Sequence, residues 1–248
     1  MKKITQKIDQ GKALISRARR IVAFCGAGIS TESGLADFRS KGGLWDRYRI
    51  VTFQEFLASP ENRVEYWSMR RELIPALLNA RPNPAHHALA ELEAEGRLDQ
   101  VITQNIDGLH QAAGSTRVIE LHGTNMTASC LTCGRQWPIA EIQQRLDAGE
   151  LDPHCGECNG LIKPDTVSFG QSMPAEAMDK AYLAAAGCDL LLMIGSSLQV
   201  QPANQFPLIA HQSGASLIFI NRTPTPYDHL ATVCYDADAG QVMQALIE

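Results

Sequence analysis

The sequence lacks the features that would place the protein in a membrane, outside the cell or on nucleic acid. No stretch approaches the ~18 consecutive apolar residues that span a bilayer. Residues 1–7 lack the apolar run of a secretory signal, so we expect a cytoplasmic protein. Lys and Arg number 22 against 27 Asp and Glu, and this net charge of −5 is a poor match for a protein that coats phosphate backbones. We expect a monomer with neither nucleic acid nor membrane as partner.

Internal repeats and low-complexity tracts are also missing. The 248 residues are 45% hydrophobic and 20% charged, a composition that excludes disorder as the main state. At about 150 residues per domain, this length allows one large domain or one domain carrying a smaller insert.

Cysteine supplies the most informative local pattern. Four of the seven cysteines, Cys130, Cys133, Cys155 and Cys158, have the spacing C-x2-C-x21-C-x2-C. Two residues between cysteines let both sulfurs of a knuckle face one ion, and two knuckles complete a tetrahedron of thiolates, which suits zinc. Because four thiolates leave no open coordination position, we expect this zinc to be structural. Two disulfides are the alternative, and the missing secretory signal argues against them.

Short apolar runs alternate with helical patterns along most of the chain. The runs are typical of strands buried on both faces. The expected strands are 21–25, 101–103, 118–121, 166–169, 190–194, 217–220 and 232–235. The expected helices are 4–18, 60–79, 83–95, 105–113, 174–187, 201–213 and 239–247. This alternation predicts parallel strands joined by crossover helices, and therefore an α/β fold with a doubly wound parallel sheet.

Two segments depart from the alternation. Residues 124–163 hold all four knuckle cysteines and are too short to form a core alone, so we expect a zinc-binding insert. Binding the ion can supply on the order of 10 kcal/mol to such a module. The sheet domain then comprises 1–123 and 164–248. Residues 36–59 have no strand pattern and predict a long loop over the ligand, so that 36–80 is partly this covering loop and partly a helical segment.

Small and polar residues follow the predicted strands. Gly26-Ala27-Gly28 comes directly after the first strand, where such a turn presents backbone N–H groups to a pyrophosphate. Thr31 stands where the dinucleotide fingerprint has a third Gly or Ala, which weakens a dehydrogenase assignment. Four further strands are followed by Gln104, Asn105 and Asp107, by His122, by Gly195, Ser196 and Ser197, and by Asn221. Individually these residues could cap helices, but together they predict a ligand site at one sheet edge.

In order and spacing, the motifs together resemble the sirtuin family of NAD-dependent protein deacylases. The motifs are GAGIS, SGLADFRS, TQNIDGLH, ELHG, the paired CxxC knuckles, FG at 169–170, GSSL and FIN, and the resemblance runs from about 21 to 235. It implies a Rossmann-like domain with a small zinc-binding module. It also implies that the protein consumes NAD and acyl-lysine proteins or peptides. The expected products are nicotinamide, the deacylated lysine and O-acyl-ADP-ribose.

The resemblance also implies roles for individual residues. His122 matches the catalytic base, and Asn105 and Asp107 match catalytic positions that shape the nicotinamide pocket and the adjacent ribose. A histidine with a pKa near ~6.5 can be neutral at working pH and activate a ribose hydroxyl. The implied NAD contacts are Gly26, Ala27, Gly28, Ser30, Glu32, Phe38, Arg39, Gln104, Asn105, Asp107, Gly195, Ser196, Ser197, Asn221 and Asp238.

Substrate recognition is expected in two further segments. Val167, Phe169 and Gly170 are expected to line or pair with the substrate as an added strand. Relatives that favour succinyl or malonyl groups tend to carry Tyr-x-x-Arg in the acyl pocket, whereas here Trp67 stands three residues before Arg70. This favours acetyl-lysine and leaves longer or acidic acyl groups as the alternative. Two family positions also differ, with Ala36 in place of the usual Pro and Gln171 in place of Glu.

Two other functions compete with this interpretation. A protein mono-ADP-ribosyltransferase would cleave NAD in the same way, but it has less need of a base such as His122. A zinc ribbon that binds nucleic acid would be basic, whereas residues 124–163 hold two more acidic than basic residues.

Overall fold

A computed structural model describes residues 2–36 and 48–248 of the chain. Its large sheet consists of β1 (Ile21–Cys25), β2 (Leu98–Thr103), β3 (Val118–Glu120), β7 (Leu190–Ile194), β8 (Ser216–Ile220) and β9 (Val233–Tyr235). The strand order is β3-β2-β1-β7-β8-β9, and every neighbouring pair is parallel. This is the order of a Rossmann sheet, in which the direction of strand addition reverses between β1 and β7. The predicted doubly wound α/β fold is therefore confirmed.

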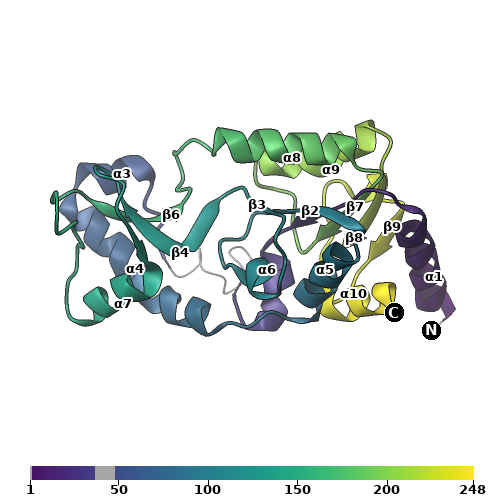
Figure 1. The fold of residues 1–248 in the computed structure, drawn as a ribbon, viewed down its shortest axis with the longest axis horizontal. Coiled ribbons are helices and arrows are strands. Elements are labelled where there is room, and N and C mark those ends of the chain that lie inside the picture. Colours follow the sequence, from purple (N-terminus) through teal and green to yellow (C-terminus); the bar gives the residue numbers. More distant parts are fainter. Residues whose placement is uncertain (1, 37–47) are drawn as a thin grey trace.

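Helices cover both faces of this sheet (Figure 1). On one face, α1 (Lys2–Arg17), α5 (Pro84–Ala94) and α10 (Ala239–Ile247) share a hydrophobic core with the strands. On the other face, α8 (Ala175–Gly187) and α9 (Phe206–Gln212) share a second core. The two central strands, β1 and β7, are fully buried, which explains why their sequences are continuous apolar runs.

A small domain lies at the other end of the elongated molecule, away from both chain termini (Figure 1). Its antiparallel sheet has the order β5-β4-β6 and consists of β4 (Gly123–Cys130), β5 (Gln136–Pro138) and β6 (Ile162–Thr166). The sheet packs with α3 (Phe53–Ala58), α4 (Pro60–Asn79) and α7 (Ile139–Asp147) in a third core. The small sheet runs slightly beyond the expected 124–163, and its core borrows the two helices from the preceding segment.

The predicted strand over 166–169 is wrong. The strand there is β6, which ends at Thr166, and the next residues bond to other segments instead of a ladder. The amide of Val167 donates to the His122 carbonyl, and the Phe169 carbonyl accepts from the amide of Phe53 at the start of α3. Tertiary contacts at this position replace the strand pairing that the apolar pattern predicts.

Three other segments differ from the sequence prediction. Part of the expected loop 36–59 is α3, which begins with a capping box between Thr52 and Glu55. The expected helix 105–113 is reduced to α6 (Leu109–Ala112), because Asp107 accepts from the Leu109 amide and Gly108 has a φ of 68°. The expected single helix over 201–213 is divided into the 3-10 helix η2 (Ala203–Gln205) and α9. Two further 3-10 helices are η1 (Ala27–Ser33) and η3 (Asp228–Leu230). None of the described helices combines the length and the apolar composition that crossing a membrane requires.

Candidate active site

A cavity of about 610 Å³ lies where the carboxyl ends of the large-sheet strands face the small domain. Its walls come from the loops after all six strands of the large sheet, from α4 and from the segment after β6. This volume is typical of small-molecule sites, which span roughly 300–1,000 Å³. The predicted residues that line it are Gly26, Ala27, Gly28, Arg70, Gln104, Asn105, His122, Val167, Phe169, Gly170, Gly195, Ser196, Ser197 and Asn221.

The glycine turn after β1 packs against the turn after β7. A Cβ on Gly28 would lie 2.7 Å from the Cα of Gly195. Gly195 has a φ of 64°, and its own Cβ would lie 2.2 Å from the Ile29 nitrogen. The amides of Gly26 and Gly28 donate to carbonyls of Ile194 and Gly195, so they do not stand free for a pyrophosphate as the sequence pattern suggests. These glycines instead bring two strand ends together and leave bare backbone in the cavity wall.

A buried hydrogen-bond network stands behind the glycine turn. The Ser30 hydroxyl donates to Asp107 Oδ2 at 2.7 Å, and Asn105 Nδ2 donates to Ser30 Oγ and to the Gly26 carbonyl. Because Nδ2 faces the turn, Asn105 Oδ1 is the atom left to accept a hydrogen bond from the cavity. Burial raises the pKa of Asp107, against hydrogen bonds from Ser30 and the Leu109 amide. Asp107 supports the cavity wall from behind.

His122 follows β3 and lines the cavity. Its Nδ1 lies 2.8 Å from the Gln104 carbonyl oxygen. Because a carbonyl only accepts, Nδ1 carries the hydrogen and Nε2 keeps its lone pair. Burial lowers the pKa of His122 from its ordinary 6.5, so the ring is neutral at pH 7. Gln104 is itself fixed, since its amide donates to the Cys25 carbonyl and its side chain to Ser196 Oγ at 3.1 Å.

The charge of the cavity suits an anionic ligand. Its described lining residues include no carboxylate, and they include Arg70, which has no carboxylate partner among the described residues. Arg49 and Arg222 also line it, but they are paired with carboxylates outside the lining. A dinucleotide carries two phosphates, together with ribose hydroxyls that can bond to Ser196 and Asn221. The bare backbone at the glycine turn, the arginines and these polar groups therefore fit NAD.

Several predicted NAD contacts lie away from the cavity wall. Glu32 accepts from the amide of Gly240, and Asp238 forms an ion pair with Arg222, so both support neighbouring segments. Ser30 and Asp107 belong to the network behind the glycine turn. Phe38 and Arg39 lie outside the described residues.

One face of α4 lines the cavity. Tyr66, Met69, Arg70 and Leu73 have the spacing i, i+3, i+4, i+7 and all contribute to the wall. Trp67, which the sequence analysis placed in the substrate pocket, has no exposed surface and packs in the small-domain core. Helical spacing counted from Arg70 fits Tyr66 at i−4 and Trp67 at i−3 equally, so the sequence alone does not decide between them. Arg49 and 200–202 also line the cavity and carry no sequence signal.

Two nitrogens of Arg70 donate within the protein, and its buried Nε has no partner among the described residues. Nη1 donates to Asn125 Oδ1 at 2.9 Å, and Nη2 donates to Thr166 Oγ1 at 3.3 Å. The guanidinium carbon lies 5.0 Å from the centre of the Tyr66 ring. Arg70 therefore braces α4 against β4 and β6.

The segment 167–170 joins the two domains beside the cavity. The Val167 amide donates to the His122 carbonyl at 2.8 Å. At the other end, the Phe53 amide donates to the Phe169 carbonyl, and Gln54 Nε2 donates to the Gly170 carbonyl at 3.0 Å. The segment is thus held next to the candidate base by backbone contacts.

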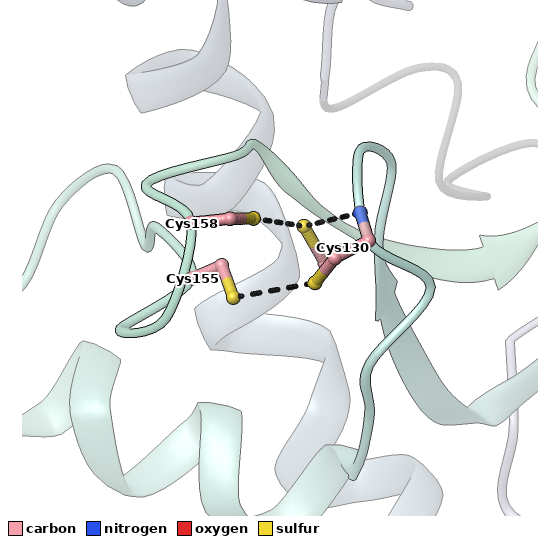
Figure 2. Close-up of side chains that lie close together, drawn as sticks. Cys130, Cys155 and Cys158 are labelled. Carbon is pink, nitrogen blue, oxygen red and sulfur yellow. Dashed lines mark hydrogen bonds between the residues drawn. The ribbon is translucent and has the colours of Figure 1, made fainter.

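The four knuckle cysteines converge at the far end of the small domain. Figure 2 shows the Cys155–Cys158 loop facing the loop that follows β4. The Sγ atoms lie within 4.8 Å of one another, and the Cys130–Cys158 and Cys133–Cys155 separations are 3.5 and 3.7 Å. A tetrahedral Zn–S₄ site with ~2.3 Å bonds has sulfurs about 3.8 Å apart, so the geometry fits one zinc ion.

Backbone amides around these sulfurs favour thiolate. The amides of Cys133 and Thr132 point at Cys130 Sγ from 3.5 and 3.4 Å, and they lower the pKa of that thiol to about 6. The amides of Cys158 and Glu157 likewise lower the pKa of Cys155, whereas the neighbouring cysteine side chains help to raise the pKa of Cys133 and that of Cys158. The donor set and its surroundings support the predicted structural zinc site.

Comparisons with known proteins agree with this geometry. The model of the Sir2 family matches residues 26–202. The NAD-dependent protein deacetylase of Thermodesulfovibrio yellowstonii is 50% identical over 243 residues, which are 98% of this chain and 95% of that protein. That of Rhodopseudomonas palustris is 43% identical over 97% of this chain and 96% of the relative. A solved structure of Sir2 with a p53 peptide and NAD+ superposes with a TM-score of 0.88 at 36% identity, covering 97% of each chain.

Proposed function

Because this chain belongs to the Sir2 family, we propose that it is an NAD-dependent protein-lysine deacetylase. The reaction consumes NAD, acetyl-lysine and water, and it releases nicotinamide, free lysine and O-acetyl-ADP-ribose. The observation that carries the proposal is His122, which is neutral, fixed in one tautomer and placed between the polar strand ends and the segment 167–170 in a single cavity. Relatives of similar length carry the same activity in their names.

NAD, when bound, supplies the ribose that loses nicotinamide and receives the acetyl group. The residues that bind it are the cavity-lining members of the predicted set: Gly26, Ala27, Gly28, Gln104, Asn105, Gly195, Ser196, Ser197 and Asn221. Arg49 and Arg222 line the same wall, where Arg49 is paired with Glu55 and Glu65 and Arg222 with Asp238. Phe38 and Arg39 remain proposed as contacts on the covering loop.

His122 acts as the general base of the reaction. With Nδ1–H donated to the Gln104 carbonyl, Nε2 is the only ring atom that can take a proton, and it takes it from a ribose hydroxyl. The carbonyl acceptor also holds the ring in position as positive charge develops on it. Burial keeps the ring unprotonated at neutral pH, which is the state that a base requires.

Asn105 and Asp107 position groups and do not attack. Asn105 Oδ1 accepts from a water or a ribose hydroxyl, because its Nδ2 is bonded to Gly26 and Ser30. Asp107 holds Ser30 and the first turn of α6, so the shape of the nicotinamide side of the wall depends on it. Placing reactants next to each other without a competing nucleophile limits hydrolysis of NAD.

The acyl-lysine peptide binds along 167–170 as an added strand, with its acyl chain directed toward α4. Acetyl-lysine is the proposed substrate, because Arg70 already donates to Asn125 and Thr166 and stacks on Tyr66. Longer acyl groups would have to share the wall formed by Met69 and Leu73.

The test is to incubate the purified protein with NAD and one peptide carrying acetyl-lysine or succinyl-lysine, and to identify products by mass spectrometry. We expect nicotinamide, deacetylated peptide and O-acetyl-ADP-ribose, with acetyl turned over faster. ADP-ribosylated peptide would identify a mono-ADP-ribosyltransferase, and no NAD-dependent product would refute the proposal. The monomeric state, the cytoplasmic location and the absence of nucleic acid or membrane partners stay predictions from the sequence.

A further inference from the structure

Lys163 is a buried cation whose function neither the reaction nor the zinc site explains. It lies on β6 opposite Ser129 of β4, and its residue is only 3% exposed. Its Nζ donates to the carbonyls of Pro164 and Thr166 and lies 6.0 Å from the centre of the Phe53 ring. Lys163 has no carboxylate partner among the described residues, and burying an unpaired ammonium group is costly, so packing alone would favour an apolar residue here.

The Lys163 ammonium fixes one particular peptide unit. The carbonyl of the Thr166–Val167 peptide accepts from Lys163, and the amide of the same peptide donates to the His122 carbonyl at 2.8 Å. This single peptide plane therefore connects a cation of the small domain to the backbone of the candidate base. Thr166 and Val167 also line the cavity, and the latter begins the proposed substrate-binding segment.

Strand pairing holds this peptide on one side only, through the Gly123–Thr166 pair and the Val167 amide. The β4–β6 register is irregular between the pairs Gly123–Thr166 and Ala128–Pro164, and a proline has no amide to donate. A second cavity of about 350 Å³, lined by Lys163 among others, lies on the other side of the segment. Thr166 and Val167 line both cavities, so the hydrogen bonds of their shared peptide contribute to holding it in place.

We infer that Lys163 is a positioning residue of the acyl-transfer reaction, whose ammonium fixes the Thr166–Val167 peptide and thereby the distance between His122 and the bound acyl-lysine. The inference rests on the proposed function. Lys163 touches neither the base nor the substrate, so its effect on turnover passes entirely through this peptide. A misplacement of about 1 Å at a reacting centre can cost about a hundredfold in rate.

The charges around Lys163 make its hydrogen bond to the Thr166–Val167 peptide sensitive to alkaline pH. Burial and the Arg70 guanidinium on α4 lower the pKa of Lys163 to about 8, and the Asp165 carboxylate on β6 opposes them. His122 is neutral near this pH, and α3 presents the Phe53 ring, which does not titrate. The ammonium is the stronger donor, so activity should fall as pH rises through about 8.

The experiment compares Lys163→Met, which removes the charge, with Lys163→Arg, which keeps it and does not titrate below pH 12. With acetyl-lysine peptide and NAD, we expect Lys163→Met to lose about tenfold to a hundredfold in kcat/KM for the peptide. Its KM for NAD should stay within about twofold, because the proposed NAD contacts among the cavity-lining residues follow strands of the large sheet. Lys163→Arg should recover most of the activity and move the alkaline limb of the pH profile upward by at least about one pH unit.

Lys180→Met, on the exposed side of α8, is the matched control and should behave as wild type. Zinc content and melting temperature show whether each variant is folded. If Lys163→Met fails to fold, the comparison of the pH profiles of Lys163→Arg and wild type still tests the inference. An unchanged alkaline limb, or a folded Lys163→Met with wild-type kinetics, would overturn the inference.

Hydrogen exchange separates this inference from the proposed function, because it needs no turnover. Peptides covering 163–171 should exchange faster in Lys163→Met than in wild type, whereas β7 should be unchanged. An inactive wild-type enzyme counts against the proposed function alone. Unaltered exchange over 163–171 counts against the role of Lys163, whatever the enzyme is found to catalyse.

Discussion

At the scale of single residues, one hydrogen bond and burial suit His122 to the proposed role of general base. The Gln104 carbonyl holds the hydrogen on Nδ1, and burial keeps the ring neutral. We expect His122→Ala to lower kcat about 10²- to 10⁴-fold, the range that general-base catalysis contributes. NAD affinity, measured by titration calorimetry, should change little, because the remaining wall is intact.

The proposed role of His122 also predicts how the activity of the wild type changes with pH. The base must be unprotonated, so activity falls on the acid side as pH drops through the lowered pKa of His122. His211→Ala, on an exposed turn of α9, is the control that should leave both rate and profile unchanged. Near-normal turnover by His122→Ala would remove the base from the mechanism.

Whether the sequence predicts the position of a single residue depends on which contacts fix that position. His122, Gln104 and Asn105 directly follow apolar strands, so parallel topology alone brings them to one edge. Trp67 illustrates the opposite case, since only the rotation of α4 decides that it packs inward while Tyr66 faces the cavity. Lys163 has no sequence signal, because the hydrogen bonds that explain it are made to backbone at an irregular pairing.

At the scale of elements, long apolar runs and helical patterns determine the large sheet, whereas short elements depend on tertiary contacts. The bounds of β1, β7, α4 and α10 coincide with the sequence prediction. The small sheet and α7 escaped it because β5 has three residues and β4 mixes polar and apolar positions. Zinc and the borrowed helices α3 and α4 supply the stability that these elements lack.

Removing zinc should therefore unfold the small domain and leave the large sheet folded. Structural zinc contributes on the order of 10 kcal/mol, and the small-domain core shares none of its buried residues with the two cores of the large sheet. We expect Cys155→Ser, or treatment with a chelator, to lower zinc content, to expose Trp67 and Trp137 as a red shift in fluorescence, and to abolish activity. Cys234→Ser, outside the cluster, should keep its zinc. Zinc-free protein with wild-type fluorescence would contradict a structural role.

At the scale of the whole molecule, two buried histidines relate stability to pH. His86 on α5 and His110 on α6 pack edge to face with ring centres 4.9 Å apart. His86 Nδ1 accepts from the Asn83 amide, and the other three ring nitrogens have no partner within the described part of the chain. Burial lowers the pKa of His86 to about 4 and that of His110 to about 3. Both rings are therefore neutral wherever the protein is folded near neutral pH.

The unfolded chain binds protons at these histidines near pH 6.5, whereas the folded protein does not bind them until about pH 4 or below. The stabilisation that comes from keeping these two histidines neutral should thus be complete above pH 6.5. Below that pH the free energy of unfolding should fall by about 1.4 kcal/mol per pH unit for each histidine. His110→Phe keeps the aromatic packing and removes one titrating group, so its urea-unfolding free energies between pH 6 and pH 4.5 should fall less steeply by that amount. Because the carboxylates are common to both proteins, the difference in slope isolates the histidine. The exposed His211→Phe should keep the wild-type slope, and the same slope in His110→Phe would show that this ring is already protonated, or accessible to water, in the folded protein.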